Sequence, residues 1–278
     1  MYALPDGVSQ VSMLRLVLVA MLSASPQSDA SAQAPPPQQP LSVYHISPKV
    51  DLPVTIGASL GIVLPDAFAD RLIKSRCPCN PQEVNSFDRG AIGNTNPFAR
   101  SLSDATAGAA IILPLVADAF DVGLSPPLME DGAVFIQTLA VNGALVTAAK
   151  YSVQRPLPRT YAGDPNLIAK PGGYRSFYSG HTSLVFAALS ATAMTIRLRH
   201  GEKTWPWIVT AVVGASVAIE RVADGRHFPT DVIAGAVMGT ATGIAVPSLH
   251  ERRRASARRW TVGPAGNGGI VIVWSCNL

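Results

Sequence analysis

Two histidines in the C-terminal half of the chain have the residue types and spacing needed for chemistry on phosphate. His227 precedes Asp231 by four residues, which places both side chains on one face near the start of a helix. A carboxylate at that spacing can fix the tautomer of the imidazole and raise its basicity. We therefore predict that His227 is a nucleophile toward phosphorus and that Asp231 orients its ring.

The second histidine follows a serine and a glycine at the start of an apolar stretch. Ser179, Gly180 and His181 predict a helix N-terminus whose amides face phosphate oxygens, with the Ser179 hydroxyl as a further donor. His181 would then protonate the oxygen that leaves phosphorus, because a leaving alkoxide needs an acid that titrates near ambient pH.

Basic residues from separate stretches can neutralise a transferring phosphoryl group, which carries charge on three oxygens. Guanidinium groups match pairs of these oxygens, and lysine adds a point charge. The candidates are Lys150, Arg155, Arg159 and Arg221. For Arg159 and Lys150 the alternative is contact with lipid headgroups, and we assign only that contact to Lys170 and Arg175.

The elements that must position these residues are apolar helices. Of the 278 residues, 48% are hydrophobic and 14% are charged, against roughly 25% charged residues in an average soluble domain. Five apolar stretches are each able to span a membrane, with buried helices of a soluble bundle as the alternative. These stretches cover residues 104–123, 131–149, 182–198, 206–223 and 231–248. Asp104 and Thr182 stand where helix N-caps are expected, and Pro229 and Thr230 mark the start of the last helix.

The sequence divides into four regions. Residues 1–34 look like a signal peptide or N-terminal anchor, and residues 35–103 like a proline-rich spacer and polar loop with a short apolar helix. That apolar run, Val54 to Leu64, is too short to cross a bilayer, so we expect it to lie on the membrane or against the bundle. Residues 104–250 form the predicted catalytic helical domain, and residues 251–278 a basic, glycine-rich tail.

Charge predicts a membrane orientation and argues against nucleic acid as a partner. The net charge is +4, but no nucleic-acid recognition motif accompanies the basic residues. Positive charge near Arg197, Arg199 and Lys203 and in the tail predicts that these segments are cytoplasmic, so that the phosphate motifs face outward. A cleaved signal followed by five spans gives the same result, with the new N-terminus outside.

Three cysteines are too few for a disulfide framework. Cys77 and Cys79 are separated by a single proline, and we expect this spacing to be too awkward for a mutual bridge. No nearby histidine completes a zinc set, and a bond from Cys276 to either residue would contradict the predicted topology.

These motifs resemble those of the type 2 phosphatidic acid phosphatase (PAP2) superfamily, which also includes bacterial class A acid phosphatases and vanadium haloperoxidases. The family motifs are Lys-x6-Arg-Pro, Pro-Ser-Gly-His and Ser-Arg-x5-His-x3-Asp, and the resemblance covers residues 150–231. Three positions depart from them: Leu157 replaces the first-motif arginine, Tyr178 the second-motif proline, and Glu220 the third-motif serine. We prefer Arg155 for the missing arginine, with Arg159 as a stand-in.

The resemblance implies an all-α, membrane-embedded bundle with about five or six apolar helices. It also implies hydrolysis of a phosphomonoester or diphosphate through a phosphohistidine, without a metal or other cofactor. A lipid phosphate of the phosphatidate or polyprenyl diphosphate type is the expected substrate, in a bacterial-type inner membrane with the site facing the periplasm or exterior. The alternatives are a vanadium-dependent haloperoxidase and a non-catalytic membrane protein with a degraded site, the latter suggested by Leu157 and Glu220.

Overall fold

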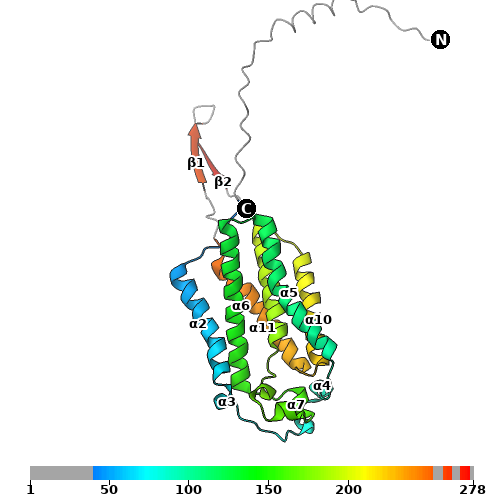
Figure 1. The fold of residues 1–278 in the computed structure, drawn as a ribbon. Coiled ribbons are helices and arrows are strands. Elements are labelled where there is room, and N and C mark those ends of the chain that lie inside the picture. Colours follow the sequence, from blue (N-terminus) through cyan, green and yellow to red (C-terminus); the bar gives the residue numbers. More distant parts are fainter. Residues whose placement is uncertain (1–39, 253–258, 265–269, 276–278) are drawn as a thin grey trace, which may run out of the picture. The chain divides into compact units, whose positions relative to one another are not determined.

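The structure is a computed structural model and describes residues 40–252, 259–264 and 270–275. A bundle of long helices makes up most of this part of the chain. Figure 1 shows these helices running alongside one another. They are α2 (Pro48–Ala67), α5 (Pro97–Val122), α6 (Pro126–Val153), α9 (Gly180–His200), α10 (Trp205–Ala223) and α11 (Pro229–His250). The predicted all-α bundle is confirmed.

Short helices connect the long ones, and α3, α4 and α7 lie at one end of the bundle (Figure 1). The short elements are α3 (Ala69–Leu72), η1 (Pro81–Glu83), α4 (Ser86–Arg89), α7 (Pro158–Tyr161), α8 (Pro165–Ile168) and η2 (Pro171–Tyr174). After the bundle, β1 (Arg259–Pro264) and β2 (Ile270–Ser275) pair as an antiparallel hairpin.

Helix α9 is the central helix, because it contacts α5, α6, α10 and α11. Glycines on α11 let the two backbones approach closely. A Cβ atom on Gly243 would lie 2.5 Å from the carbonyl oxygen of Ala187, and one on Gly239 would clash with the carbonyl oxygen of Ser183. Close approach of small-residue faces is a common way to pack helices in a membrane.

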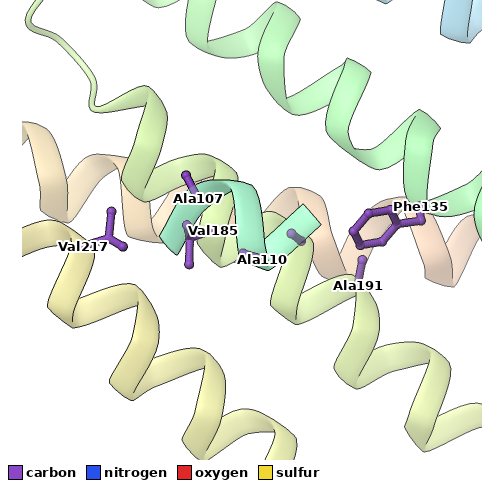
Figure 2. Packing of buried hydrophobic residues seen from close by; sticks show 7 residues of the cluster. Ala107, Ala110, Phe135, Val185, Ala191 and Val217 are labelled. Carbon is purple, nitrogen blue, oxygen red and sulfur yellow. The ribbon is translucent and has the colours of Figure 1, made fainter. Parts of the chain in front are cut away.

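Small apolar side chains fill the space around α9, as Figure 2 shows. Buried residues of this cluster come from α5, α6, α9 and α10; they are Ala107, Ala110, Phe135, Val185, Ala188, Ala191 and Val217. Alanine and valine dominate because the helices are close, and this packing fixes the ends of the helices that carry the predicted site residues.

Five described helices are long and apolar enough to cross a membrane: α2, α5, α6, α10 and α11. Their outer faces expose large apolar side chains, for example Leu113 at 63% and Ile219 at 70%, as expected of surfaces that contact lipid. Four of these helices match predicted stretches. The predicted stretch 182–198 lies in α9, which is not among these five helices and packs against α5, α6, α10 and α11.

The prediction of a short helix at Val54 to Leu64 is wrong. Helix α2 has 20 residues and continues through Pro53 and Pro65. These prolines suggested helix boundaries, but each one removes a single backbone hydrogen bond. Packing against α6 supports the continuous helix, and the Cβ position of Gly61 lies 3.6 Å from Ala144.

The start of α2 and the end of α11 lie at the same end of the bundle. Tyr44 pairs with Glu251, and the His45 amide donates to the His250 carbonyl at 2.8 Å. These contacts place residues 40–47 and the start of the tail on the same side of a membrane that the bundle crosses. The five-span scheme, with the mature N-terminus outside and the tail inside, is therefore wrong. The predicted signal peptide itself lies outside the described residues.

The expectation that Cys77 and Cys79 do not bridge is also wrong. They form a disulfide with their Cα atoms 4.4 Å apart, at the short end of the usual range, because the chain turns at Pro78. The Cys77 amide donates to the Tyr174 hydroxyl at 3.3 Å, which ties this loop to η2. Cys276 lies outside the described residues.

Candidate active site

A pocket of about 280 Å³ gathers both predicted histidines and four cationic side chains. Its charged and titratable lining residues are His181, His227, Lys150, Arg175, Arg221, Arg226 and Asp66. They come from α2, α6, α9, α10, the segment before α9 and the connection between α10 and α11. The fold thus brings Lys150, His181, Arg221 and His227 together, as the sequence predicted.

His227 is buried at 4% exposure, and its partner differs from the predicted one. Nδ1 lies 2.7 Å from the backbone carbonyl oxygen of Ser176, and 3.9 Å from the nearer Asp231 carboxylate oxygen. A carbonyl can only accept, so Nδ1 carries the hydrogen and Nε2 keeps its lone pair. The Ser176 carbonyl therefore orients the ring directly, which corrects the assignment of that contact to Asp231.

Asp231 acts on the surroundings of His227. Its carboxylate accepts hydrogen bonds from the Ser176 hydroxyl at 2.5 Å and from the Phe228 amide at 2.9 Å. The same carboxylate accepts a third hydrogen bond, from Arg155 at 2.6 Å. Asp231 therefore fixes the segment that carries the carbonyl partner of His227 and the backbone that follows the histidine.

The electrostatics of the pocket favour a neutral His227. Burial lowers the pKa of His227 well below its ordinary value, and the positive charges of Lys150 and Arg221 lower it further. The hydrogen bond to Ser176 opposes this shift but does not reverse it. A neutral imidazole is the form that can attack phosphorus.

Arg155 does not line the pocket, contrary to our preference for it as the first-motif arginine. It donates to Asp88 at 2.8 Å and to Asp231 at 2.6 Å, and its guanidinium lies 4.0 Å from the ring centre of Phe228. Burial raises the pKa of Asp88, but hydrogen bonds from Arg155 and Thr230 outweigh it, so the pKa lies below its ordinary value. The Arg155 guanidinium thus forms ion pairs with two buried carboxylates.

Arg159 also lies outside the pocket lining and pairs with Asp164 at 2.9 Å. The residue of this stretch that does reach the pocket is Leu157. Arg175 lines the same pocket and donates to Asp66 at 2.5 Å. From the sequence we expected Arg175 to contact only lipid headgroups. In the structure it lines the candidate phosphate pocket.

Arg226 is the other cation that the sequence analysis did not select. It directly precedes His227, and its Nε has no hydrogen-bond partner among the described residues. Position next to a motif histidine was the available signal for Arg226, and position shortly before the Ser-Gly-His motif was the signal for Arg175.

Ser179 and Gly180 lie at the start of α9, directly before the pocket residue His181. Ser179 is fully buried and caps α9, because its hydroxyl accepts from the Thr182 amide at 3.4 Å. The predicted cap at Thr182 is therefore wrong, and the Ser179 hydroxyl does not line the pocket. Gly180 lets Lys150 approach the start of α9, since a Cβ atom there would lie 3.6 Å from the lysine Nζ.

Comparison with known proteins agrees with this geometry. Residues 132–255, which include every motif residue, match the model of the PAP2 superfamily. The chain is thus similar to this superfamily over a little less than half of its length. The match begins inside α6 and leaves α2 and α5 outside the matched range.

Two curated relatives are similar over this region. A lipid A 1-phosphatase from Porphyromonas gingivalis is 32% identical over 107 residues, which is 38% of this chain and 20% of that protein. An undecaprenyl-diphosphatase from Sulfolobus acidocaldarius is 30% identical over 110 residues, which is 39% of this chain and 50% of that protein. The chain thus spans half or less of the length of these relatives. The crystal structure of Aquifex aeolicus LpxE aligns with 63% of this chain and 99% of its own, at 24% identity and a TM-score of 0.42.

Proposed function

We propose that this chain is a metal-independent phosphatase that hydrolyses a phosphomonoester or diphosphate of a lipid through a phosphohistidine. The observation that carries the proposal is the pocket itself. It combines a buried, neutral His227 with a free Nε2, a second histidine, and the side chains of Lys150, Arg175 and Arg221. Neutral nucleophile, acid and excess positive charge are what phosphoryl transfer requires when no metal takes part.

In the first step the Nε2 lone pair of His227 attacks phosphorus. A phosphorus–nitrogen bond forms while the bond from phosphorus to the ester oxygen breaks, and His181 gives that oxygen its proton. Lys150, Arg221 and the two further pocket arginines neutralise the charge on the three phosphoryl oxygens.

In the second step water replaces the histidine. The now neutral His181 takes a proton from water as its oxygen attacks phosphorus, and the phosphorus–nitrogen bond breaks. Inorganic phosphate leaves, and His227 returns to the neutral form that its burial favours.

A lipid substrate is supported by the surroundings of the pocket. Five helices of the described chain are apolar enough to cross a membrane, and a pocket of about 280 Å³ is small for a whole lipid. A phosphate headgroup can enter it while the acyl or prenyl chain stays in the bilayer. Both curated relatives carry names of enzymes that act on lipid phosphates.

We propose that the pocket faces the exterior of a bacterial-type inner membrane. The Cys77–Cys79 disulfide lies in a loop that contacts η2, near the pocket, and disulfides persist in oxidising compartments. Arg197 in the last turn of α9 and Lys203 in the loop after it lie at the end of this helix away from the pocket histidine, and they suit the cytoplasmic side. With an internal tail, residues 40–47 are internal too, which argues against signal cleavage next to them.

Hydrolysis is tested with purified protein in detergent, with EDTA present, on phosphatidate, polyprenyl diphosphate and a soluble aryl phosphate. We expect phosphate release that His227→Ala abolishes and that the distant His200→Ala leaves unchanged. Rapid quenching should trap an acid-labile phosphate on His227. No turnover of any substrate would favour the degraded-site alternative, and halide oxidation with vanadate and peroxide in place of hydrolysis would favour a haloperoxidase.

The orientation is tested separately with reporter fusions after Leu249. We expect a cytoplasmic reporter signal, because the tail shares its side with the basic loop after α9. A periplasmic signal at this position would contradict the outward-facing pocket and leave the hydrolytic proposal untouched.

A further inference from the structure

Asp104 contacts the proposed acid of the reaction. Its Oδ1 lies 2.8 Å from Nε2 of His181 and 3.7 Å from Nη1 of Arg221. It belongs to α5, which precedes the matched PAP2 region. Asp104 was expected to cap α5, but the helix begins at Pro97 and its cap is Asn96, which accepts from the Ala99 amide at 3.1 Å. The Asp104 side chain therefore does not cap α5.

The charges around His181 show why a carboxylate matters there. The charged groups that face the ring are Lys150 from α6, Arg221 from α10 and Asp104 from α5, and His227 faces it as a neutral ring. Burial of the ring and the two positive charges oppose the protonated imidazolium. Asp104 is the negative group that favours it, so an acid at this position depends on Asp104.

The position of Asp104 is held by a neighbouring contact between α5 and α10. Arg221 donates to the hydroxyl of Ser103 at 3.0 Å, and Ser103 is fully buried. This bond fixes the turn of α5 that carries Asp104 beside the pocket. Asp104 itself does not line the pocket and leaves it open to the substrate phosphate.

We propose that Asp104 is a positioning residue that favours the protonated form of His181 and directs its proton toward the leaving oxygen. With Nε2 hydrogen-bonded to Asp104, Nδ1 is the nitrogen that delivers the proton in the first step and accepts one from water in the second. The proposal rests on the phosphatase function proposed above and assigns a residue outside the recognised motifs to it.

The test is Asp104→Asn, which keeps the shape and removes the charge. The measurement is kcat/KM for aryl phosphates of increasing phenol pKa, ending with an alkyl phosphate. General acid catalysis contributes about 10²–10⁴-fold and matters most for poor leaving groups. We expect a loss of about tenfold or more for the alkyl phosphate and less than about threefold for 4-nitrophenyl phosphate. The alkaline limb of the pH profile should move to lower pH, because the imidazolium loses its carboxylate.

Asp121→Asn is the matched control. Asp121 lies at the other end of α5, and its carboxylate lies 2.9 Å from Nε2 of His200. This pair resembles the pair of Asp104 and His181. We expect Asp121→Asn to leave the dependence on the leaving group unchanged. Asp104→Glu should recover part of the loss, because it restores the charge.

An equal loss on all substrates, no loss, or a gain would overturn the role of Asp104. These outcomes differ from a failure of the phosphatase proposal. That failure would appear in the unmodified protein, as absent hydrolysis or as turnover that survives His227→Ala.

Discussion

Replacing Arg155 with alanine is expected to destabilise the fold far more than it weakens substrate binding. The guanidinium bridges Asp88 and Asp231, which are both fully buried, and stacks on Phe228. In Arg155→Ala the two carboxylates would lose their shared cation. Thr230 and Ser176 would remain as their hydrogen-bond donors.

Removing one partner of a buried ion pair costs about 3–5 kcal/mol, because the other charge stays buried without compensation. A cation over an aromatic ring contributes about 0.5–2 kcal/mol more, and the two contributions do not add fully. We therefore expect Arg155→Ala to lower the free energy of unfolding by about 4 kcal/mol. Arg175 pairs with the half-exposed Asp66, so Arg175→Ala should cost less than about 1 kcal/mol.

The assay combines denaturant unfolding in detergent micelles with phosphatidate kinetics. Arg155→Ala should unfold at lower denaturant while the folded fraction keeps a KM near that of the unmodified protein. Arg175→Ala should unfold normally and lose about 10–100-fold in kcat/KM, the equivalent of one charged hydrogen bond. Adding Asp88→Asn to Arg155→Ala should recover part of the lost stability, because it removes one buried charge.

The reasoning would be refuted by the reverse pattern. If Arg155→Ala unfolded like the unmodified protein and raised KM as much as Arg175→Ala, then Arg155 would contact the substrate. Its carboxylate partners would then have to release it on binding.

Three further outcomes follow from the same structure. Arg159→Ala should change kcat/KM less than about threefold, since Arg159 lies outside the pocket lining; a tenfold loss would restore it as a phosphate ligand. Because burial and facing cations hold the pKa of His227 low, the acid limb of kcat/KM should fall below about pH 6.5, the ordinary histidine value; a limb at or above that pH would contradict a neutral nucleophile. Gly239→Ala should lower the free energy of unfolding by more than about 1 kcal/mol because the methyl group meets the α9 backbone, whereas Gly57→Ala, with open space around it, should not.

The long helices were predictable because their apolar stretches are long, and α11 begins at Pro229 as expected. The starts of α5 and α9 were not predicted correctly. Asp104 and Thr182 have side chains that can cap a helix, yet the observed caps are Asn96 and Ser179. Several residues near a helix start can accept the free amides. Which one does so depends on where the chain enters the bundle, and that is a tertiary property.

The histidines of the site were predictable because each lies at a recognisable distance from its motif partners. Arg221 was predictable in the same way. The choice among the other arginines was not, because a sequence shows charge but hides which charges are already paired. Arg155 was selected for its position after Lys150, while its partner Asp88 lies 67 residues earlier in a polar loop. No local pattern connects the two.

The pocket lining divides the basic residues of this region into two groups. Asp88 and Asp231 hold Arg155, and Asp164 holds Arg159, so these cations stabilise the loops around the pocket. Arg221 and Arg226 line the pocket, and their Nε atoms have no hydrogen-bond partner among the described residues, although each side chain lies 3.7 Å from the carboxylate of Asp224. Leu157 also lines it, where the family motif has an arginine, and Arg175 reaches the same pocket from another segment. The positive charge available to a phosphate depends on which cations reach the pocket and not on their place in the motif. Leucine at position 157 therefore does not remove that charge.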